Sequence, residues 1–175
     1  MKIVEIQNPP SVEALVDRFG RQRYCFVLDS AQSNDGLGEW SFFGAEPFDT
    51  VTGDLADLRQ AMRPYQLEVH PEIPFTGGAV GYLSYDYGRR LENLDSLAKD
   101  DRQIPDMHFG LYDGVAALNH ETGVLFLVGH DFSNTADAVI ERLRAIVGAG
   151  LDTPTDMLEQ AATVVTKHAT MISDL

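Results

Sequence analysis

The sequence predicts an α+β fold with largely antiparallel sheets and packed helices. Residues 107–118 and 124–128 are strand-like and flank "NHETG", a five-residue turn containing glycine, as in an antiparallel hairpin. Apolar residues elsewhere recur at three- and four-residue spacing, as in amphipathic helices. At 175 residues and 44% hydrophobic content, the chain is long enough for one globular core. We expect one domain over residues 1–150, and a linker with a C-terminal helix or tail over residues 151–175.

The first half predicts short elements separated by turns. Residues 3–6 form a strand, and Ser11 caps a helix over 12–19 that stops at Gly20. Residues 24–28 are predicted as a buried strand, followed by turn-forming residues 29–38. Residues 40–45 form the next strand, and Asp54 caps a helix that ends before Pro64.

The second half contains the strand with the most glycines and the longest helix. Residues 79–85 alternate without a polar side, which predicts a central strand covered on both faces. After the hairpin, Asn134 is positioned to cap a helix that ends at Gly148. Its apolar stripe consists of Val139, Ile140, Leu143, Ile146 and Val147.

Composition excludes several classes of function. There are 27 acidic and 13 basic residues, and the net charge of −14 disfavours nucleic acid and anionic membranes as partners. Cys25 is the single cysteine, so neither an internal disulfide nor a cysteine-rich zinc site is expected. No stretch has the apolar length of a signal peptide or membrane span, and we expect a cytoplasmic protein.

The stretch "PFTGGAVGYLSYDYGRRLE", residues 74–92, raises the question of a phosphate site. It lacks the lysine of a Walker loop, its glycines lie within the strand pattern rather than between a strand and a helix, and Ser84 is not in G-x-S-x-G. Glycine within a strand costs roughly 0.5–1 kcal/mol against alanine, which favours close approach of another backbone layer. We interpret the stretch as scaffold.

The same stretch resembles the signature strand of the chorismate-utilising synthases, the family of anthranilate synthase component I and aminodeoxychorismate synthase component I. Three further segments agree in order: "FVLDSA", "WSFFGAEP" and "IPDMHFGLYDGVAALNHETGVLFLV". Together they cover residues 24–128. The forms "PDM-x-x-G-x-YD" and "YDYGRRLE" are more similar to the aminodeoxychorismate branch.

The resemblance implies a non-catalytic N-terminal part that scaffolds a catalytic half. In the family, the C-terminal half holds chorismate and Mg²⁺, and a glutamine amidotransferase subunit supplies ammonia; the motifs of that half do not occur here. We therefore expect no cofactor in this fragment and no turnover by it alone. Apolar surface left by a missing half predicts self-association.

The resemblance also implies one wall of a tryptophan pocket, formed by Leu28, Ser30 and Trp40. Where the family often has arginine before the aromatic residue, this sequence has Glu39, which reverses the charge offered to a ligand carboxylate.

Other candidate residues are interpreted as structural. Cys25 is expected in the core and His120 in an exposed turn. Asp86, Arg89, Arg90 and Glu92 are expected to form a polar cluster at the strand end, explained by salt bridging within the turn. The five histidines have no metal-ligand spacing.

Two alternatives to the scaffold function stay open: a free-standing module that binds aromatic amino acids, and a truncated gene product without activity. The N-terminal domain of an anthranilate synthase component I is a further variant of the first hypothesis.

Overall fold

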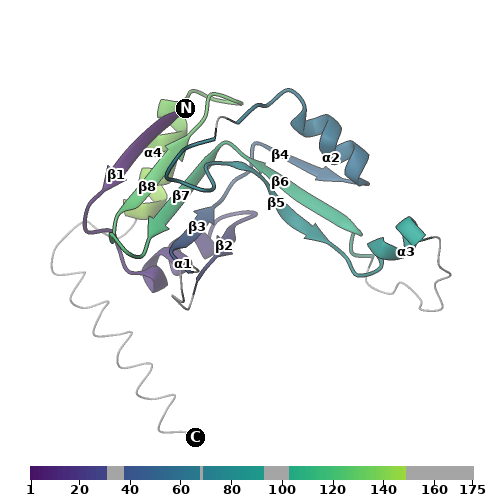
Figure 1. The fold of residues 1–175 in the computed structure, drawn as a ribbon, viewed down its shortest axis with the longest axis horizontal. Helices are drawn as coiled ribbons and strands as arrows, with labels where there is room; N and C mark the ends of the chain where they lie inside the picture. Colours follow the sequence, from purple (N-terminus) through teal and green to yellow (C-terminus); the bar gives the residue numbers. More distant parts are fainter. Residues whose placement is uncertain (31–37, 68, 93–102, 149–175) are drawn as a thin grey trace, which may run out of the picture.

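The computed structural model describes residues 1–30, 38–67, 69–92 and 103–148. Within these ranges the strands form two antiparallel sheets, which meet in an arch (Figure 1). The predicted α+β class is therefore confirmed. The predicted helix and tail after residue 150 lie outside the described residues.

The larger sheet has five strands in the order β1-β8-β7-β3-β2, all antiparallel. The predicted hairpin is its centre: β7 pairs with β8 from Gly114 opposite Gly129 to Leu118 opposite Leu125. The strands are β1 (Lys2–Ile6), β2 (Phe26–Leu28), β3 (Trp40–Gly44), β7 (Gly114–Asn119) and β8 (Leu125–Gly129).

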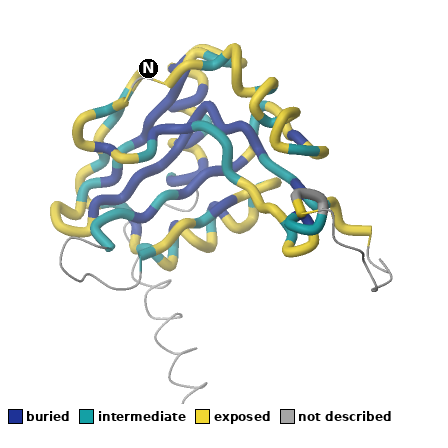
Figure 2. The backbone as a smooth tube through the Cα atoms, turned by 45° about the vertical axis from the view of Figure 1, so that its right-hand side comes forward, coloured by how far each residue is buried: buried dark blue, intermediate teal, exposed yellow. Residues whose placement is uncertain are grey.

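Two helices, α1 (Val12–Gly20) and α4 (Ala136–Gly148), cover one face of this sheet. Leu15, Phe19 and Leu143 are fully buried there, and each contributes roughly 1.5–3 kcal/mol by leaving water. Figure 2 shows the buried backbone running through the central strands. The apolar stripe predicted for residues 139–147 is thus confirmed as core.

Side-chain caps fix the starts of the helices. Ser11 accepts from the Ala14 N–H, and Asp54 forms a capping box with Asp57 at α2 (Leu55–Met62), as the sequence predicts. Helix α4 begins one residue later than expected. Thr135 Oγ1 accepts from the Ala138 N–H, so Thr135 and not Asn134 lies at the capping position.

The smaller sheet has three strands in the order β4-β6-β5. They are β4 (Asp49–Thr52), β6 (Met107–Tyr112) and β5 (Gly78–Leu83), and α3 (Tyr87–Glu92) follows β5. The sequence analysis predicted neither β4 nor α3. Strand β4 is only "DTVT", in which Val51 alone is buried, and so short a polar segment has no strand periodicity.

The prediction of a central strand over residues 79–85 is wrong. Among the described residues β5 pairs only with β6, and Tyr82 and Leu83 are 42% and 44% exposed. The sequence pattern of residues 79–85 shows that both faces of the strand are apolar. It does not show which other elements of the fold cover those faces. Strand β5 is therefore an edge strand with an uncovered apolar end.

Gly81 explains why this strand requires glycine. A Cβ atom at Gly81 would lie 2.0 Å from the His108 carbonyl oxygen and 2.5 Å from Phe109 Cα. The predicted close approach of backbone is thus present, but it comes from the neighbouring strand β6 and not from a second layer. Gly78, at φ 120°, starts the strand in a conformation that favours glycine.

The start of β2 corrects the prediction for Cys25, which is exposed and not in the core. Tyr24 has a left-handed φ of 48°, so the strand begins only at Phe26. The Tyr112 hydroxyl donates to the Tyr24 carbonyl at 2.6 Å and so fixes this turn. Burial raises the pKa of Tyr112 to about 12, so the phenol stays protonated as a donor.

Asp113 lies where one extended run of chain passes from the smaller sheet, as β6, into the larger, as β7. Its carboxylate is fully buried and accepts hydrogen bonds from Arg142 Nη2 at 2.6 Å and Ser133 Oγ at 2.9 Å. Its carbonyl accepts from the His130 N–H at 2.8 Å. The bend between the sheets is thus tied to helix α4 and to the end of β8.

His130 makes a second connection between the sheets. Its buried ring lies 5.0 Å from the Phe132 ring, and Nε2 donates to the Thr76 carbonyl, just before β5, at 3.0 Å. Burial lowers the pKa of His130, against the opposing effects of the Thr76 hydrogen bond and the nearby Asp113 and Asp131.

We predict that Asp113→Ala lowers the free energy of unfolding by about 3 kcal/mol, because Arg142 would lose the carboxylate that balances its partly buried charge. Urea denaturation measures the change. Asp137→Ala is the matched control, because Asp137 pairs with Lys2 at the surface and an exposed pair contributes less than about 1 kcal/mol. Equal losses in the two variants would contradict the role assigned to Asp113.

We predict that His130 makes stability fall as the pH drops below about 6.5, the ordinary pKa of histidine. Because the pKa is lowered in the folded state, the unfolded chain binds the proton more readily, and stability is retained only above that pH. His130→Gln keeps an N–H donor without the titration, so its unfolding midpoint should depend less on pH than that of the wild type. Identical pH profiles would refute the prediction.

Candidate functional site

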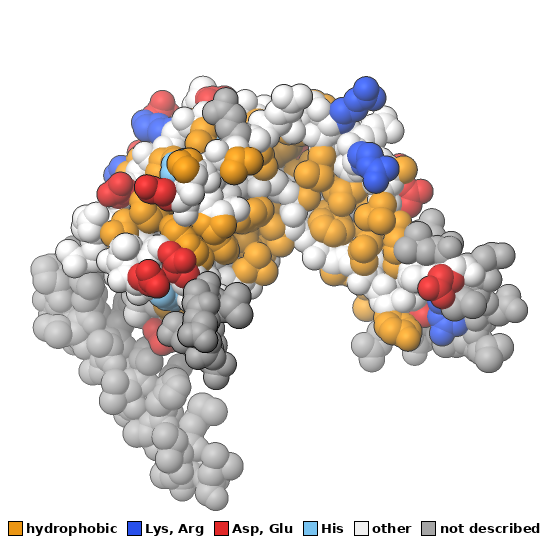
Figure 3. Space-filling view, viewed as in Figure 1, with side chains coloured by type: hydrophobic (Ala, Val, Ile, Leu, Met, Phe, Trp, Pro, Cys, Tyr) orange, Lys and Arg blue, Asp and Glu red, His pale blue; other side chains and the backbone are white. Residues whose placement is uncertain are grey.

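The face of the larger sheet opposite α1 and α4 is aromatic. Trp40 and Phe42, two residues apart on β3, lie with ring centroids 6.2 Å apart and planes within 9°, and Phe126 on β8 lies 5.8 Å from Trp40. Residues 71–76 run along this face, and Phe75 meets Phe42 edge-on at 5.7 Å. Figure 3 shows hydrophobic side chains gathered along the hollowed underside of the arch.

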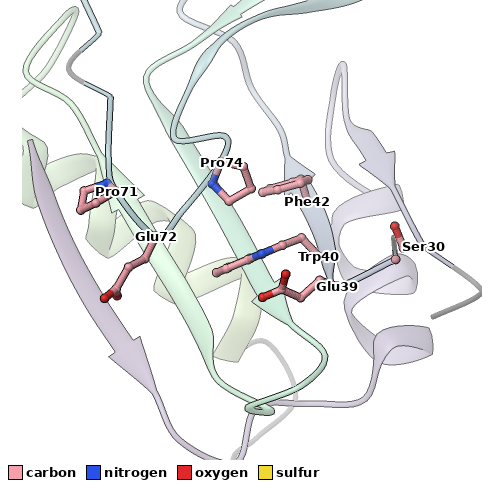
Figure 4. A pocket seen from close by; sticks show the side chains of 8 residues that line it. Ser30, Glu39, Trp40, Phe42, Pro71, Glu72 and Pro74 are labelled. Carbon is pink, nitrogen blue, oxygen red and sulfur yellow. The ribbon is translucent and has the colours of Figure 1, made fainter. Parts of the chain in front are cut away.

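A pocket of about 490 Å³ opens on this face. We call it the Trp40 pocket. In Figure 4 the Trp40 ring extends toward the chain that carries Pro71 and Glu72, and Phe42 and Pro74 lie next to it. The lining residues are Ser30, Gly38, Glu39, Trp40, Phe42, Pro71, Glu72 and Pro74.

The structure brings two of the three predicted pocket residues together. Ser30, after β2, and Trp40, at the start of β3, both line the pocket. Leu28 does not line it; it ends β2 opposite Phe42 and is 49% exposed.

The sequence analysis missed the other half of the lining. Phe42 shares the face of Trp40 by strand alternation, and this signal was available. Pro71, Glu72 and Pro74 come from a segment about thirty residues away with no strand or helix periodicity, so nothing in their local sequence places them against β3.

A buried serine holds the strand ends beside the pocket. Ser41 is fully buried, and its Oγ lies 2.6 Å from Asp29 Oδ1, 2.7 Å from His120 Nε2 and 3.2 Å from the Ser30 N–H. The hydroxyl has one proton, which it donates to Asp29. It therefore accepts from the Ser30 N–H, and its contact with His120 Nε2 fits the tautomer whose hydrogen is on Nε2.

This Ser-His-Asp group is not a nucleophile with its base. The hydroxyl proton is directed to Asp29 and not to the histidine, and the serine is fully buried. Its effect is positional, since it links the end of β2 to β3 and to the hairpin turn. His120 itself is exposed in that turn, as predicted.

Glu39 is fixed at the pocket edge. Its Oε1 accepts from Asn119 Nδ2 at 3.0 Å, and its carbonyl accepts from the His120 N–H at 2.8 Å. Glu72 is an exposed second carboxylate of the lining, and no lysine or arginine lines the pocket in the described part of the chain. The pocket thus combines an aromatic wall with negative charge.

Within the described ranges, no three histidine, cysteine or acidic side chains come together as metal ligands. No helix in those ranges has the length and apolarity to cross a bilayer. Of the polar cluster predicted after β5, one salt bridge is present: Arg89 Nε donates to Asp86 Oδ1 at 2.6 Å.

A family model described as chorismate binding enzyme matches residues 24–170. The chain belongs to this family. The resemblance inferred from the four sequence segments is thereby confirmed.

Relatives in the family carry both names given by that resemblance. The chain is 30% identical over 145 residues to aminodeoxychorismate synthase component 1 of Bacillus subtilis, covering 70% of this chain and 30% of the relative. It is 31% identical over 160 residues to anthranilate synthase component 1 of Mycolicibacterium smegmatis, covering 79% of this chain and 30% of the relative. The chain thus spans about a third of the length of these relatives.

The fold is similar to that of a solved structure, anthranilate synthase component I from Streptococcus pneumoniae. The TM-score is 0.54 at 18% identity, over 71% of this chain and 32% of that one. At this identity the likeness establishes the fold alone.

We predict that Ser41→Ala lowers the free energy of unfolding by about 1–3 kcal/mol, because Ser30, Asp29 and His120 lose their common partner. Thermal and urea unfolding measure the loss. An unchanged midpoint would show that these three groups are satisfied without the serine.

Proposed function

We propose that this chain is the N-terminal, non-catalytic part of an aminodeoxychorismate synthase component I. In this role it scaffolds a catalytic half that makes 4-amino-4-deoxychorismate from chorismate and ammonia, toward 4-aminobenzoate and folate. Family membership and the share of the relatives' length that the chain spans support the proposal.

The observation that carries the proposal is the uncovered end of β5. Tyr82 and Leu83 are more than two-fifths exposed, and Tyr85 just beyond the strand is 94% exposed. In the described part of the chain β5 pairs on one side only, and its other edge offers backbone donors and acceptors to another strand. Covering such a surface contributes roughly 25 cal/mol for each Å² of apolar area, so it favours a partner surface over water.

Charge supports the assignment of catalysis to the other half. Chorismate is a dianion, and a domain with a net charge of −14 repels it unless a metal ion intervenes. We propose that Mg²⁺ and chorismate bind in the C-terminal half and that a glutamine amidotransferase subunit delivers ammonia there. In this proposal the present chain stabilises the folded structure of the C-terminal half.

The Trp40 pocket favours a second function, binding of an aromatic small molecule. Aromatic walls with a few polar groups are typical of ligand sites, and the pocket volume suits a single-ring or indole ligand. Ser30 and Trp40 are the proposed contacts, since both line the pocket and Leu28 does not. This function is compatible with the scaffold role, and with membership of the anthranilate branch.

We predict that the chain associates with a separately supplied C-terminal half of component I and that only the mixture converts chorismate, ammonia and Mg²⁺ to aminodeoxychorismate. Leu83→Asp should weaken the association at least about tenfold, because it places a charge on the uncovered end of β5. Product analysis and sedimentation measure both effects, and sedimentation of the chain alone tests self-association.

The matched control is Val16→Asp. Val16 lies on α1, away from β5, and its side chain is 39% exposed. The Val16→Asp variant should associate with the C-terminal half as the wild type does. Turnover by the 175 residues alone, or equal weakening by both variants, would refute the scaffold proposal.

A further inference from the structure

We propose that the Trp40 pocket selects an aromatic amine, a ligand with a flat apolar body and an ammonium group but no carboxylate. The inference rests on the small-molecule function proposed above for this pocket. It assigns a ligand class that differs from a free amino acid in charge.

The apolar part of the pocket suits a flat ring. Trp40 and Phe42 present nearly parallel rings, and Pro71 and Pro74 lie across from them on the chain that precedes β5. A ring that enters between these residues leaves water on both of its faces. A cation on such a ring is further attracted to the face of tryptophan.

The charge of the lining points the same way. Asn119 holds Glu39 Oε1 at 3.0 Å, which fixes that carboxylate at the edge of the pocket, and Glu72 adds a second negative charge. The lining thus attracts an ammonium group and repels a carboxylate.

The histidine next to this lining does not reverse the field. His70 precedes Pro71, and its Nδ1 accepts from the N–H groups of Glu72 and Ile73 at 3.2 and 3.0 Å. A nitrogen that accepts two hydrogen bonds is unprotonated, so the imidazole is neutral. The second carboxylate therefore faces the pocket without a histidine cation beside it.

Trp40 is the only tryptophan in the chain and reports binding directly by its fluorescence. Four phenyl ligands of nearly equal size separate shape from charge: phenethylamine, L-phenylalanine, 3-phenylpropionate and 2-phenylethanol. Phenethylamine should bind at least about fivefold more tightly than phenylalanine, and phenylpropionate most weakly. Added salt should reduce the preference, because these charges are partly exposed.

Glu39→Gln and Glu72→Gln should each lower the ratio of amine affinity to 2-phenylethanol affinity, because each removes one negative charge from the lining. Glu121→Gln, in the exposed hairpin turn away from the pocket, is the matched control and should bind as the wild type does. Unfolding midpoints establish that each variant is folded.

Equal affinity for amine and alcohol, or tighter binding of either carboxylate ligand, would overturn the inference while the small-molecule pocket stands. Absence of any fluorescence change with all four ligands would overturn both the inference and that proposed function. Neither result bears on the scaffold role, which is measured by association and turnover.

Discussion

The fold depends on one buried carboxylate at the bend between the two sheets. Residues 107–119 form one extended run whose first half pairs with β4 and β5 and whose second half pairs with β3 and β8. Asp113 stands between the halves. A fully buried carboxylate is costly unless it is paired and hydrogen-bonded, and Arg142 and Ser133 meet that requirement only with α4 packed in place. The interactions of Asp113 therefore fix both the angle between the sheets and the position of α4.

The Trp40 pocket is a consequence of that constraint. With α1 and α4 on one face of the larger sheet, the aromatic face of β3 is left toward the inside of the arch. Residues 71–76 must cross from α2 to β5, and the His130 hydrogen bond to Thr76 fixes where they pass. Ser41 then holds the ends of β2 and β3 at the pocket margin. Two local hydrogen-bond centres thus determine a site whose lining comes from distant parts of the sequence.

The sequence predicted those features whose cause is local. The caps Ser11 and Asp54, the hairpin and the buried stripe of α4 each depend on residues within a few positions of one another, and each was confirmed. The failures depend on distant chain. The edge position of β5 depends on which strands pair with it, and among the described residues only β6 does. The exposure of Cys25 depends on a turn held by Tyr112, and the Pro71 and Pro74 wall of the pocket depends on a crossing that no periodicity records. Ser30 and Trp40 came from family resemblance, which carries such long-range information.

The charge of the chain bears on what covers the apolar end of β5. A second copy would match its apolar surface but would add another net charge of −14, so repulsion grows as two copies approach. A different polypeptide with a neutral or basic rim gains the same apolar burial without that cost. Screening at high salt weakens the repulsion and leaves the apolar term, so self-association should increase with ionic strength. Low salt therefore favours a heterologous partner over a second copy at the end of β5. The same negative field favours the ammonium group of an aromatic amine at the Trp40 pocket.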